Sequence, residues 1–325
     1  MSIKVLDIIR GDKKVIAQAL NLLENRKPEY HSQVKELMAQ LTLSARQGRH
    51  VIGITGPPGV GKSTLLTHLI REYRSRGKTV GVISVDPSSK KSGGALLGDR
   101  ARIAYDPNDE GLFIRSMAAG SHMGGLALRT RYCLSVFEVA YDIVILETVG
   151  VGQSETEIDN VAETIAFVVQ PGSGDALQFM KAGIMEIPHV LVVNKADQKM
   201  LAVKARRDLK IAKAYSQSFL EGWELGIVMT SALEGWGHKE LVDVFENHYI
   251  FMKDRNILQK KRKENHAYWI YMLLKERFGN FGIEALGGEN EIFKKIYETN
   301  LASPLEYVEV FKRVIIENVP KIVNE

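Results

Sequence analysis

The sequence has a single cysteine among its 325 residues, Cys133. One thiol cannot form a disulfide framework, and it cannot supply the cysteine cluster of a structural metal site. Because Cys133 lies in an apparently apolar helix, we expect it to be a small core residue. A chain without disulfides is typical of a reducing compartment, so we predict a cytoplasmic protein.

Long apolar runs and a strong charge of one sign are also missing. No run approaches the ~18 apolar residues that a membrane-spanning helix needs. The first residues, MSIKVLDIIRGDKK, lack the apolar core of a signal peptide. The net charge is only +4 on 325 residues, which gives no reason to propose nucleic acid or a membrane as the main partner.

Three segments with different patterns follow one another along the chain. Residues 1–48 and 251–325 show the apolar spacing of amphipathic helices. Residues 49–250 alternate helical stretches with short runs rich in Val and Ile, which are typical of strands buried on both faces of a parallel sheet. Six such runs are predicted as strands: residues 51–54, 80–85, 143–146, 165–169, 190–193 and 227–229. We therefore predict an α/β fold with a mainly parallel sheet flanked by helices, plus N- and C-terminal helical extensions.

A phosphate-binding loop follows the first predicted strand. The sequence there fits G-x-x-x-x-G-K-[ST] between a strand and a helix, which predicts a P-loop NTPase. The candidate phosphate-binding residues are Gly56, Pro57, Pro58, Gly59, Val60, Gly61, Lys62, Ser63 and Thr64. The glycines let backbone N–H groups wrap around phosphates, and the helix N-terminus adds the positive end of its dipole. We expect Lys62 to contact the β and γ phosphates and the Ser63 hydroxyl to coordinate Mg²⁺.

Two short motifs after later strands indicate which base is bound. Asp197 closes an N-K-x-D motif, and its carboxylate can accept from both the ring N–H and the exocyclic amine of guanine, donors that adenine lacks. One strand later, a Ser-Ala-Leu turn offers a backbone N–H to the guanine O6. The candidate base-binding residues are Asn194, Lys195, Asp197, Ser231, Ala232 and Leu233. An ordinary polar turn is the alternative for either motif alone, but their order after the P-loop favours GTP and GDP.

Acidic residues at the ends of predicted strands are candidates for catalysis and for metal binding. Asp86 follows the second strand, Glu147 follows the third, and Asp99 lies in a glycine-rich stretch. Mg²⁺ prefers few carboxylates together with phosphate oxygens and waters, so the three need not all bind it directly. Each residue could instead be a helix cap or a turn residue. We favour a functional role for Asp86 and Glu147, and both interpretations of Asp99 stay open.

The second predicted switch begins at Glu147 and includes Gly150, where a backbone N–H can sense the γ-phosphate. Many signalling GTPases place a water-orienting Gln directly after this glycine. Here Val151 follows, and Gln153 is displaced by two positions. We therefore expect slow intrinsic GTP hydrolysis that a partner or a loop rearrangement accelerates, as in a timing device.

With these motifs, the chain resembles the MeaB/ArgK family, the GTPase chaperones of adenosylcobalamin-dependent methylmalonyl-CoA mutase. The matching stretches are residues 23–29, 56–64, 85–89, 92–100, 122–126, 147–155 and 192–197. The resemblance covers most of residues 1–240 and departs from the family at Pro188-His189 and over residues 200–223. It implies a homodimer held by the C-terminal helices. It also implies a client enzyme, which would be methylmalonyl-CoA mutase or a related acyl-CoA mutase.

The resemblance further implies roles for individual residues. Four residues would surround Mg²⁺, some through water: Ser63, Asp86, Asp99 and Glu147. A third switch would cover residues 172–184, in which Asp175 and Lys181 link partner binding to GTP hydrolysis. By spacing alone, Lys181 would be an ordinary solvent-facing lysine. The catalytic candidates are therefore Lys62, Glu147, Asp175 and Lys181.

Three other functions remain as alternatives. A metal-insertion GTPase of the HypB/UreG type usually needs a ligand cluster, whereas the eight histidines are scattered and Cys133 stands alone. A transport-associated ATPase or kinase conflicts with the N-K-x-D motif and with the lack of a membrane segment. A scaffold without enzymatic activity would bind nucleotide only to stabilise a dimer. Mg²⁺-dependent GTP turnover, measured with and without a B12-dependent mutase, distinguishes these functions.

Overall fold

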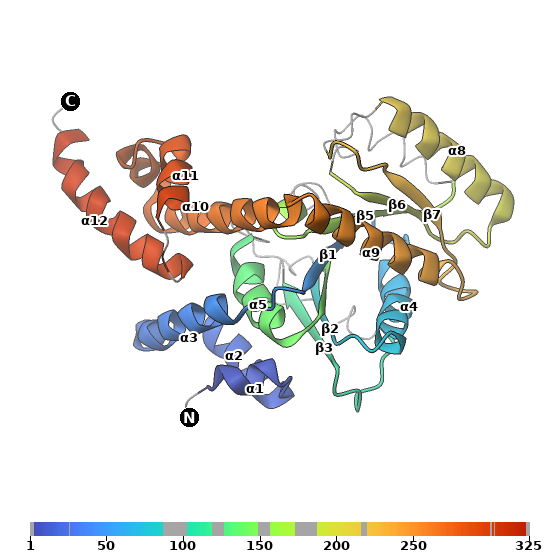
Figure 1. Ribbon diagram of the computed structural model, residues 1–325, viewed down its shortest axis with the longest axis horizontal. Helices are drawn as coiled ribbons and strands as arrows, with labels where there is room; N and C mark the ends of the chain where they lie inside the picture. Colours follow the sequence, from blue (N-terminus) through green and yellow to red (C-terminus); the bar gives the residue numbers. More distant parts are fainter. Residues whose placement is uncertain are drawn as a thin grey trace, which may run out of the picture. The chain divides into compact units, whose positions relative to one another are not determined.

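The computed structural model describes residues 3–25, 27–86, 103–118, 127–148, 157–172, 187–215, 220–299, 301 and 303–322. The chain divides into two compact units. The first unit consists of Met1–Gln47, Met123–Ala140 and Lys260–Glu325. The second consists of Gly48–His122 and Tyr141–Gln259. Figure 1 labels the helices and strands of both.

In the part of the chain that the structure describes, the second unit is built on a seven-stranded parallel sheet with the order β3-β2-β4-β1-β5-β6-β7. The strands are β1 (His50–Thr55), β2 (Val80–Asp86), β3 (Leu112–Ala118), β4 (Ile143–Thr148), β5 (Thr164–Val169), β6 (Val190–Val193) and β7 (Gly226–Met229). Every neighbouring pair is parallel, so the predicted fold class is confirmed. After β1 the chain continues to β2, which lies beyond β4 on one side of β1, whereas β5 pairs with β1 on its other side. Ligands of such sheets bind at this reversal, beyond the carboxyl ends of the strands.

The sequence pattern does not predict the edge strand β3. Its sequence, LFIRSMA, places Arg115 and Ser116 between apolar residues, so it lacks the continuous apolar run of a central strand. Among the described residues, strand β3 pairs only with β2, and an edge position tolerates such polar residues. Five of the six predicted strands are central, whereas β7 lies at the opposite edge and is partly buried.

Helices cover both faces of this sheet (Figure 1). Helices α4 (Lys62–Ser75) and α9 (His238–Asp254) pack with one apolar cluster, and α8 (Lys199–Tyr215) packs with another over β6 and β7. Strand β5 shows the alternation, because Ala166 and Val168 belong to the first cluster while Phe167 and Val169 belong to the second. Neighbouring residues of the strand therefore pack into apolar clusters on opposite faces of the sheet.

Arg76, just after α4, joins that helix to α9. Its guanidinium lies 2.8 Å from Glu72 Oε1, 2.7 Å from Asp243 Oδ1 and 2.7 Å from Glu246 Oε2. An exposed ion pair alone contributes about 1 kcal/mol or less, but a planar guanidinium shared by three carboxylates fixes geometry as well. This link holds together the helix that follows the P-loop and the helix that follows the predicted base-binding turn.

The first unit is helical in the part of the chain that the structure describes. It contains α1 (Val5–Ile9), α2 (Lys13–Leu23), α3 (His31–Ser44), α5 (Ala127–Ala140), most of α10 (Ile257–Ala285), α11 (Glu289–Glu298) and α12 (Pro304–Ile322). Arg46 ties three segments together, because it donates to the carbonyls of Ile9 and Val139 at 2.9 Å each. Cys133 on α5 is fully buried, as predicted. The role of the last helices in dimerisation stays a prediction.

The described residues include no helix with both the length and the apolar character that a membrane crossing requires.

Three histidines gather at the amino ends of strands in the second unit. His50 Nε2 lies 2.6 Å from the Thr164 hydroxyl, which lies 2.8 Å from His248 Nδ1. The ring of His189 lies 4.2 Å from that of His248. Burial, followed by the charges of His189 and His50, lowers the pKa of His248 far below its usual value. His248 is therefore neutral in the folded protein at neutral pH.

We expect this burial to make stability depend on pH. An unfolded histidine titrates near pH 6.5, so below that pH the unfolded chain binds a proton that folded His248 does not. Stability is therefore lost as the pH falls, and His248 alone costs about 2 kcal/mol between pH 7 and pH 5. Urea unfolding at both pH values measures the loss. His248→Phe should reduce the pH dependence by about this amount, whereas His31→Gln, at an exposed histidine, should leave it unchanged.

Candidate functional site

The predicted phosphate loop lies between the end of β1 and the start of α4. Gly56 has φ +145°, and a Cβ there would lie 2.2 Å from the Val168 carbonyl oxygen on β5. Only glycine allows the chain to leave β1 so close to the neighbouring strand. The buried Lys62 side chain turns back over this loop, and its Nζ donates to the carbonyls of Gly56 at 2.7 Å and Pro57 at 3.0 Å.

The geometry of this loop suits an anion. The ammonium of Lys62 lies inside a turn whose carbonyls are neutral, at the N-terminus of the 14-residue helix α4. The buried Lys62 ammonium carries a positive charge, and the helix dipole adds positive potential at the same place. This positive potential attracts the negative charge of phosphate oxygens, so the residues present fit a nucleotide phosphate.

Ser63 and Glu147, two of the four predicted Mg²⁺ ligands, lie together. The Ser63 hydroxyl donates to Glu147 Oε1 at 3.1 Å, and the Ser84 hydroxyl donates to Glu147 Oε2 at 3.0 Å. Glu147 is only 3% exposed. A buried carboxylate beside hydroxyl groups is the oxygen-rich environment that a hard cation prefers, so this donor set fits Mg²⁺ bound next to the phosphates.

Ser84 is a site residue that the sequence analysis missed. It lies on β2 directly opposite Glu147 on β4, and its hydroxyl holds one of the two carboxylate oxygens. The only signal in the sequence is a serine inside an apolar strand. The register of two strands that are far apart in sequence is what reveals its partner.

Several predicted site residues lie outside what the structure describes. Asp86 ends β2, but the position of its side chain is outside the described part. Asp99, Gly150, Asp175 and Lys181 also lie outside the described residues. Their proposed roles in metal binding, γ-phosphate sensing and partner-dependent hydrolysis stay predictions.

Asn194 connects the phosphate loop to the predicted base-binding turn. Its side chain is fully buried, and Nδ2 donates to the Val60 carbonyl at 2.8 Å. The Oδ1 atom accepts from the Thr230 hydroxyl at 3.1 Å and from the Ala232 amide at 3.2 Å. One amide side chain therefore fixes the distance between the part of the site that suits phosphate and the part that suits a base.

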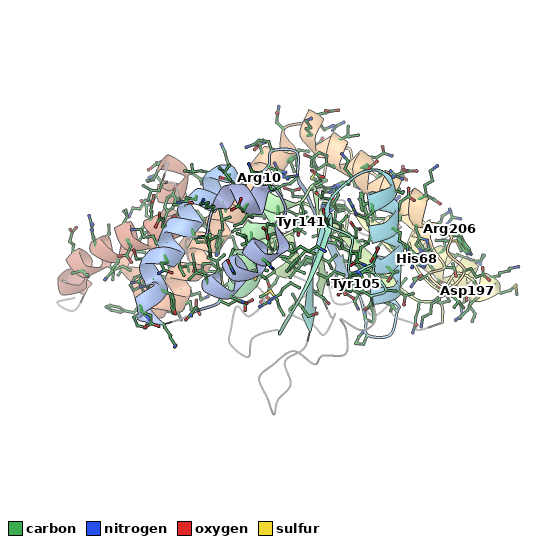
Figure 2. The ribbon with its side chains drawn as sticks, turned by 90° about the horizontal axis from the view of Figure 1, so that it is seen from below. Arg10, His68, Tyr105, Tyr141, Asp197 and Arg206 are labelled. Carbon is green, nitrogen blue, oxygen red and sulfur yellow. The ribbon has the colours of Figure 1, made fainter. Side chains whose placement is uncertain are left out.

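Asp197 and Lys195 complete this second part of the site. Asp197 Oδ1 accepts from the Ser231 hydroxyl at 2.7 Å, which orients the carboxylate and leaves acceptor capacity on its other oxygen. Lys195 has φ +56° and donates to Gln170 Oε1 at 2.7 Å. Figure 2 labels Asp197 in the yellow segment that precedes α8. The structure thus brings the N-K-x-D motif and the Ser-Ala-Leu turn together.

A comparison of two glycines tests whether the phosphate loop needs this contact with Asn194. Gly61 and Gly59 both have positive φ, +90° and +82°. A Cβ at Gly61 would lie 2.6 Å from Asn194 Nδ2, whereas a Cβ at Gly59 would meet nothing within 4 Å. We expect Gly61→Ala to weaken GDP binding at least about 100-fold, because backbone strain and a broken buried hydrogen bond each cost about 1–3 kcal/mol.

The matched control is Gly59→Ala, which carries similar backbone strain without the clash. Calorimetric titration with GDP measures both variants, and urea unfolding verifies that each one is folded. Equal losses of GDP affinity in the two variants would contradict the importance of the contact between Gly61 and Asn194.

Comparisons with known proteins agree with this geometry. The family model described as "Methylmalonyl Co-A mutase-associated GTPase MeaB" matches residues 16–285. The GTPase ArgK of Escherichia coli is 33% identical over 299 residues, which is 90% of this chain and 87% of the relative. The mouse protein named "Methylmalonic aciduria type A homolog, mitochondrial" is 30% identical over 286 residues, covering 83% of this chain and 68% of the relative.

A solved structure shares the whole architecture. The crystal structure of an LAO/AO transport system kinase has a TM-score of 0.70 and 26% sequence identity, and the match covers 95% of this chain and 96% of that one. The match therefore includes the N- and C-terminal helical segments of the chain as well as the strands of the sheet.

Proposed function

Since the chain belongs to the MeaB family of GTPases, we propose that it uses GTP to control the loading and protection of an adenosylcobalamin-dependent acyl-CoA mutase. The client would be methylmalonyl-CoA mutase or a related enzyme. The association of the MeaB family with methylmalonyl-CoA mutase supports this client, as does the name of the mouse relative. The active form would be a homodimer.

The observation that carries the nucleotide part of the proposal is the pair of hydrogen bonds made by Asn194. Because this side chain bonds both Val60 and Ala232, the phosphate loop and the base-binding turn form one rigid site. We assign guanine recognition to Asp197, which would accept from the ring N–H and the exocyclic amine. A site with an oriented carboxylate disfavours adenine, because adenine offers no donors to that acceptor.

The residues of the phosphate loop would perform the chemistry by positioning and by charge. Lys62 would leave its loop carbonyls to contact the β and γ phosphates, while backbone N–H groups of the loop hold the remaining oxygens. Ser63 and Glu147, together with Asp86 and Asp99, would hold Mg²⁺ directly or through water. When bound, Mg²⁺ supplies positive charge that stabilises the negative charge on the phosphate oxygens.

The rate of hydrolysis would be set by the partner. Val151 replaces the water-orienting glutamine that follows the switch glycine in many signalling GTPases. Hydrolysis by the isolated chain would therefore be slow. A mutase that reorganises the third switch, with Asp175 and Lys181, would accelerate it.

The test is Mg²⁺-dependent GTP turnover by the full chain, with and without an adenosylcobalamin-dependent acyl-CoA mutase. We expect slow turnover alone and an increase of about 10-fold or more with the mutase, since partner-supplied groups accelerate GTPases by large factors. Transfer of adenosylcobalamin to the mutase is measured in the same mixture. No effect of any such mutase on turnover, together with no effect of GTP on cofactor loading, would refute the chaperone role while leaving the GTPase assignment intact.

A further inference from the structure

His68 lies on α4, six residues after Lys62, and contacts the base-binding turn. Its Nε2 atom is 2.8 Å from the carbonyl oxygen of Ala232. A carbonyl oxygen only accepts hydrogen bonds, so the imidazole must donate from Nε2. Figure 2 labels His68 on α4, the helix that begins at the phosphate loop. A side chain of the phosphate-loop helix therefore holds a backbone atom of the turn predicted to meet the base.

The ring of His68 is held flat by a second histidine. His238, the first residue of α9, stacks on it with a centroid distance of 4.1 Å and an interplanar angle of 7°. His238 is only 5% exposed, and its Nε2 has no hydrogen-bond partner in the described structure. Burial, and next the charge of His68, lower the pKa of His238 to about 4. The uncharged ring of His238 therefore stacks on the His68 ring and keeps it in one orientation.

Hydrogen bonds therefore hold both the amide and the carbonyl of Ala232. Its amide donates to Asn194 Oδ1 at 3.2 Å, and its carbonyl accepts from His68. The carbonyl of Ala232 belongs to the same planar trans peptide as the amide of Leu233, so the two groups point in opposite directions. Holding the carbonyl on α4 therefore aims the Leu233 amide away from α4. The Leu233 side chain is 85% exposed, so side-chain packing does not set this direction.

We propose that His68 is a positioning residue for guanine recognition, which aims the Leu233 amide at the O6 atom of the base. This inference rests on the proposed guanine site. His68 does not touch the nucleotide itself. It acts through the Ala232–Leu233 peptide, and it connects the helix of the phosphate loop to the base-binding turn independently of Asn194.

Two substitutions separate the hydrogen bond from the shape of the ring. His68→Phe keeps an aromatic ring against His238 but has no donor, whereas His68→Gln restores an N–H donor. We expect His68→Phe to raise the Kd for GDP about 10-fold, since that corresponds to one hydrogen bond. The Kd of His68→Gln should stay within about 3-fold of the unchanged chain.

The decisive ligand is the diphosphate of 2-aminopurine riboside, which keeps the exocyclic amine but has neither O6 nor the ring N–H. The lost ring N–H weakens its contact with Asp197 equally in the unchanged chain and in the His68 variants, so the comparison between them reports on O6. His68→Phe should change the Kd for this ligand by less than about 2-fold, because the contact that His68 aims is absent. Equal weakening of GDP and of the 2-aminopurine nucleotide would overturn the proposal and make His68 a purely structural residue. An unchanged Kd for GDP in His68→Phe would overturn it as well.

Two further measurements cover the remaining outcomes. If His68→Phe does not fold, His68→Met removes the donor with a flexible side chain and is tested in the same way. In the unchanged chain, a ¹⁵N spectrum of the imidazoles should show His68 protonated on Nε2, and protonation on Nδ1 alone would overturn the proposal. Failure of the unchanged chain to bind GDP would instead refute the guanine site, so the two failures are distinguishable.

Discussion

Replacing Lys62 with alanine should reduce GTP turnover about 10³-fold, the scale of losing one preorganised charged group at a phosphoryl-transfer site. The ammonium is buried in the phosphate loop and donates to the carbonyls of Gly56 and Pro57. In the proposed site it would lie where the negative charge of the transferred phosphate develops, and no other described side chain of the loop is cationic. The measurement is single-turnover GTP hydrolysis in the presence of Mg²⁺.

The loss should come from chemistry and binding rather than from unfolding. Lys62→Ala removes a buried charge whose burial is itself costly, so the urea midpoint should not fall by much. The matched control is Lys78→Ala, at an exposed lysine shortly after α4, which should leave turnover unchanged. Turnover by Lys62→Ala at the level of the unchanged chain would show that the loop assignment is wrong.

The two nucleotide motifs are predictable from sequence because each is contiguous and follows a recognisable strand. The loop that starts at Gly56 and the motif that starts at Asn194 both come directly after apolar runs that are buried on both faces. Their backbone geometry is then dictated locally, by glycines at positive φ and by the start of a helix. The fold class is predictable for the same reason, since alternating apolar runs and helical stretches allow few arrangements.

The supporting residues are not predictable in this way. Ser84 is 63 positions from Glu147, and His68 is 164 positions from Ala232. Nothing in the local pattern around either residue indicates its partner, because strand register and helix packing create these contacts only in three dimensions. The strand containing Arg115 escapes prediction for a related reason: at the edge of the sheet, burial no longer imposes an apolar pattern.

Replacing Asp197 with asparagine should change the preferred nucleotide from GTP to xanthosine triphosphate. Asparagine keeps an oxygen that can accept from the Ser231 hydroxyl, as Asp197 Oδ1 does at 2.7 Å, but the other oxygen becomes an NH₂ donor. The exocyclic amine of guanine is also a donor, so it cannot form a hydrogen bond with this NH₂ group. Xanthine carries a carbonyl oxygen at the same position, which can accept from it. We expect kcat/KM for GTP to fall about 10²–10³-fold, since a charged hydrogen-bonding pair is lost in a site built around it.

The exchange of preference distinguishes base recognition from general damage to the site. A variant that is merely destabilised would lose both nucleotides equally, whereas this one should gain activity with xanthosine triphosphate. Asp208→Asn, on the neighbouring helix α8, is the matched control and should keep the GTP preference. Ser231→Ala should lower GTP affinity by a smaller factor, about 10-fold, because it frees the Asp197 carboxylate without changing its acceptor character. Strict retention of GTP preference in Asp197→Asn would contradict the assignment, because a carboxylate that recognises guanine cannot be exchanged for an amide without inverting what the pocket accepts.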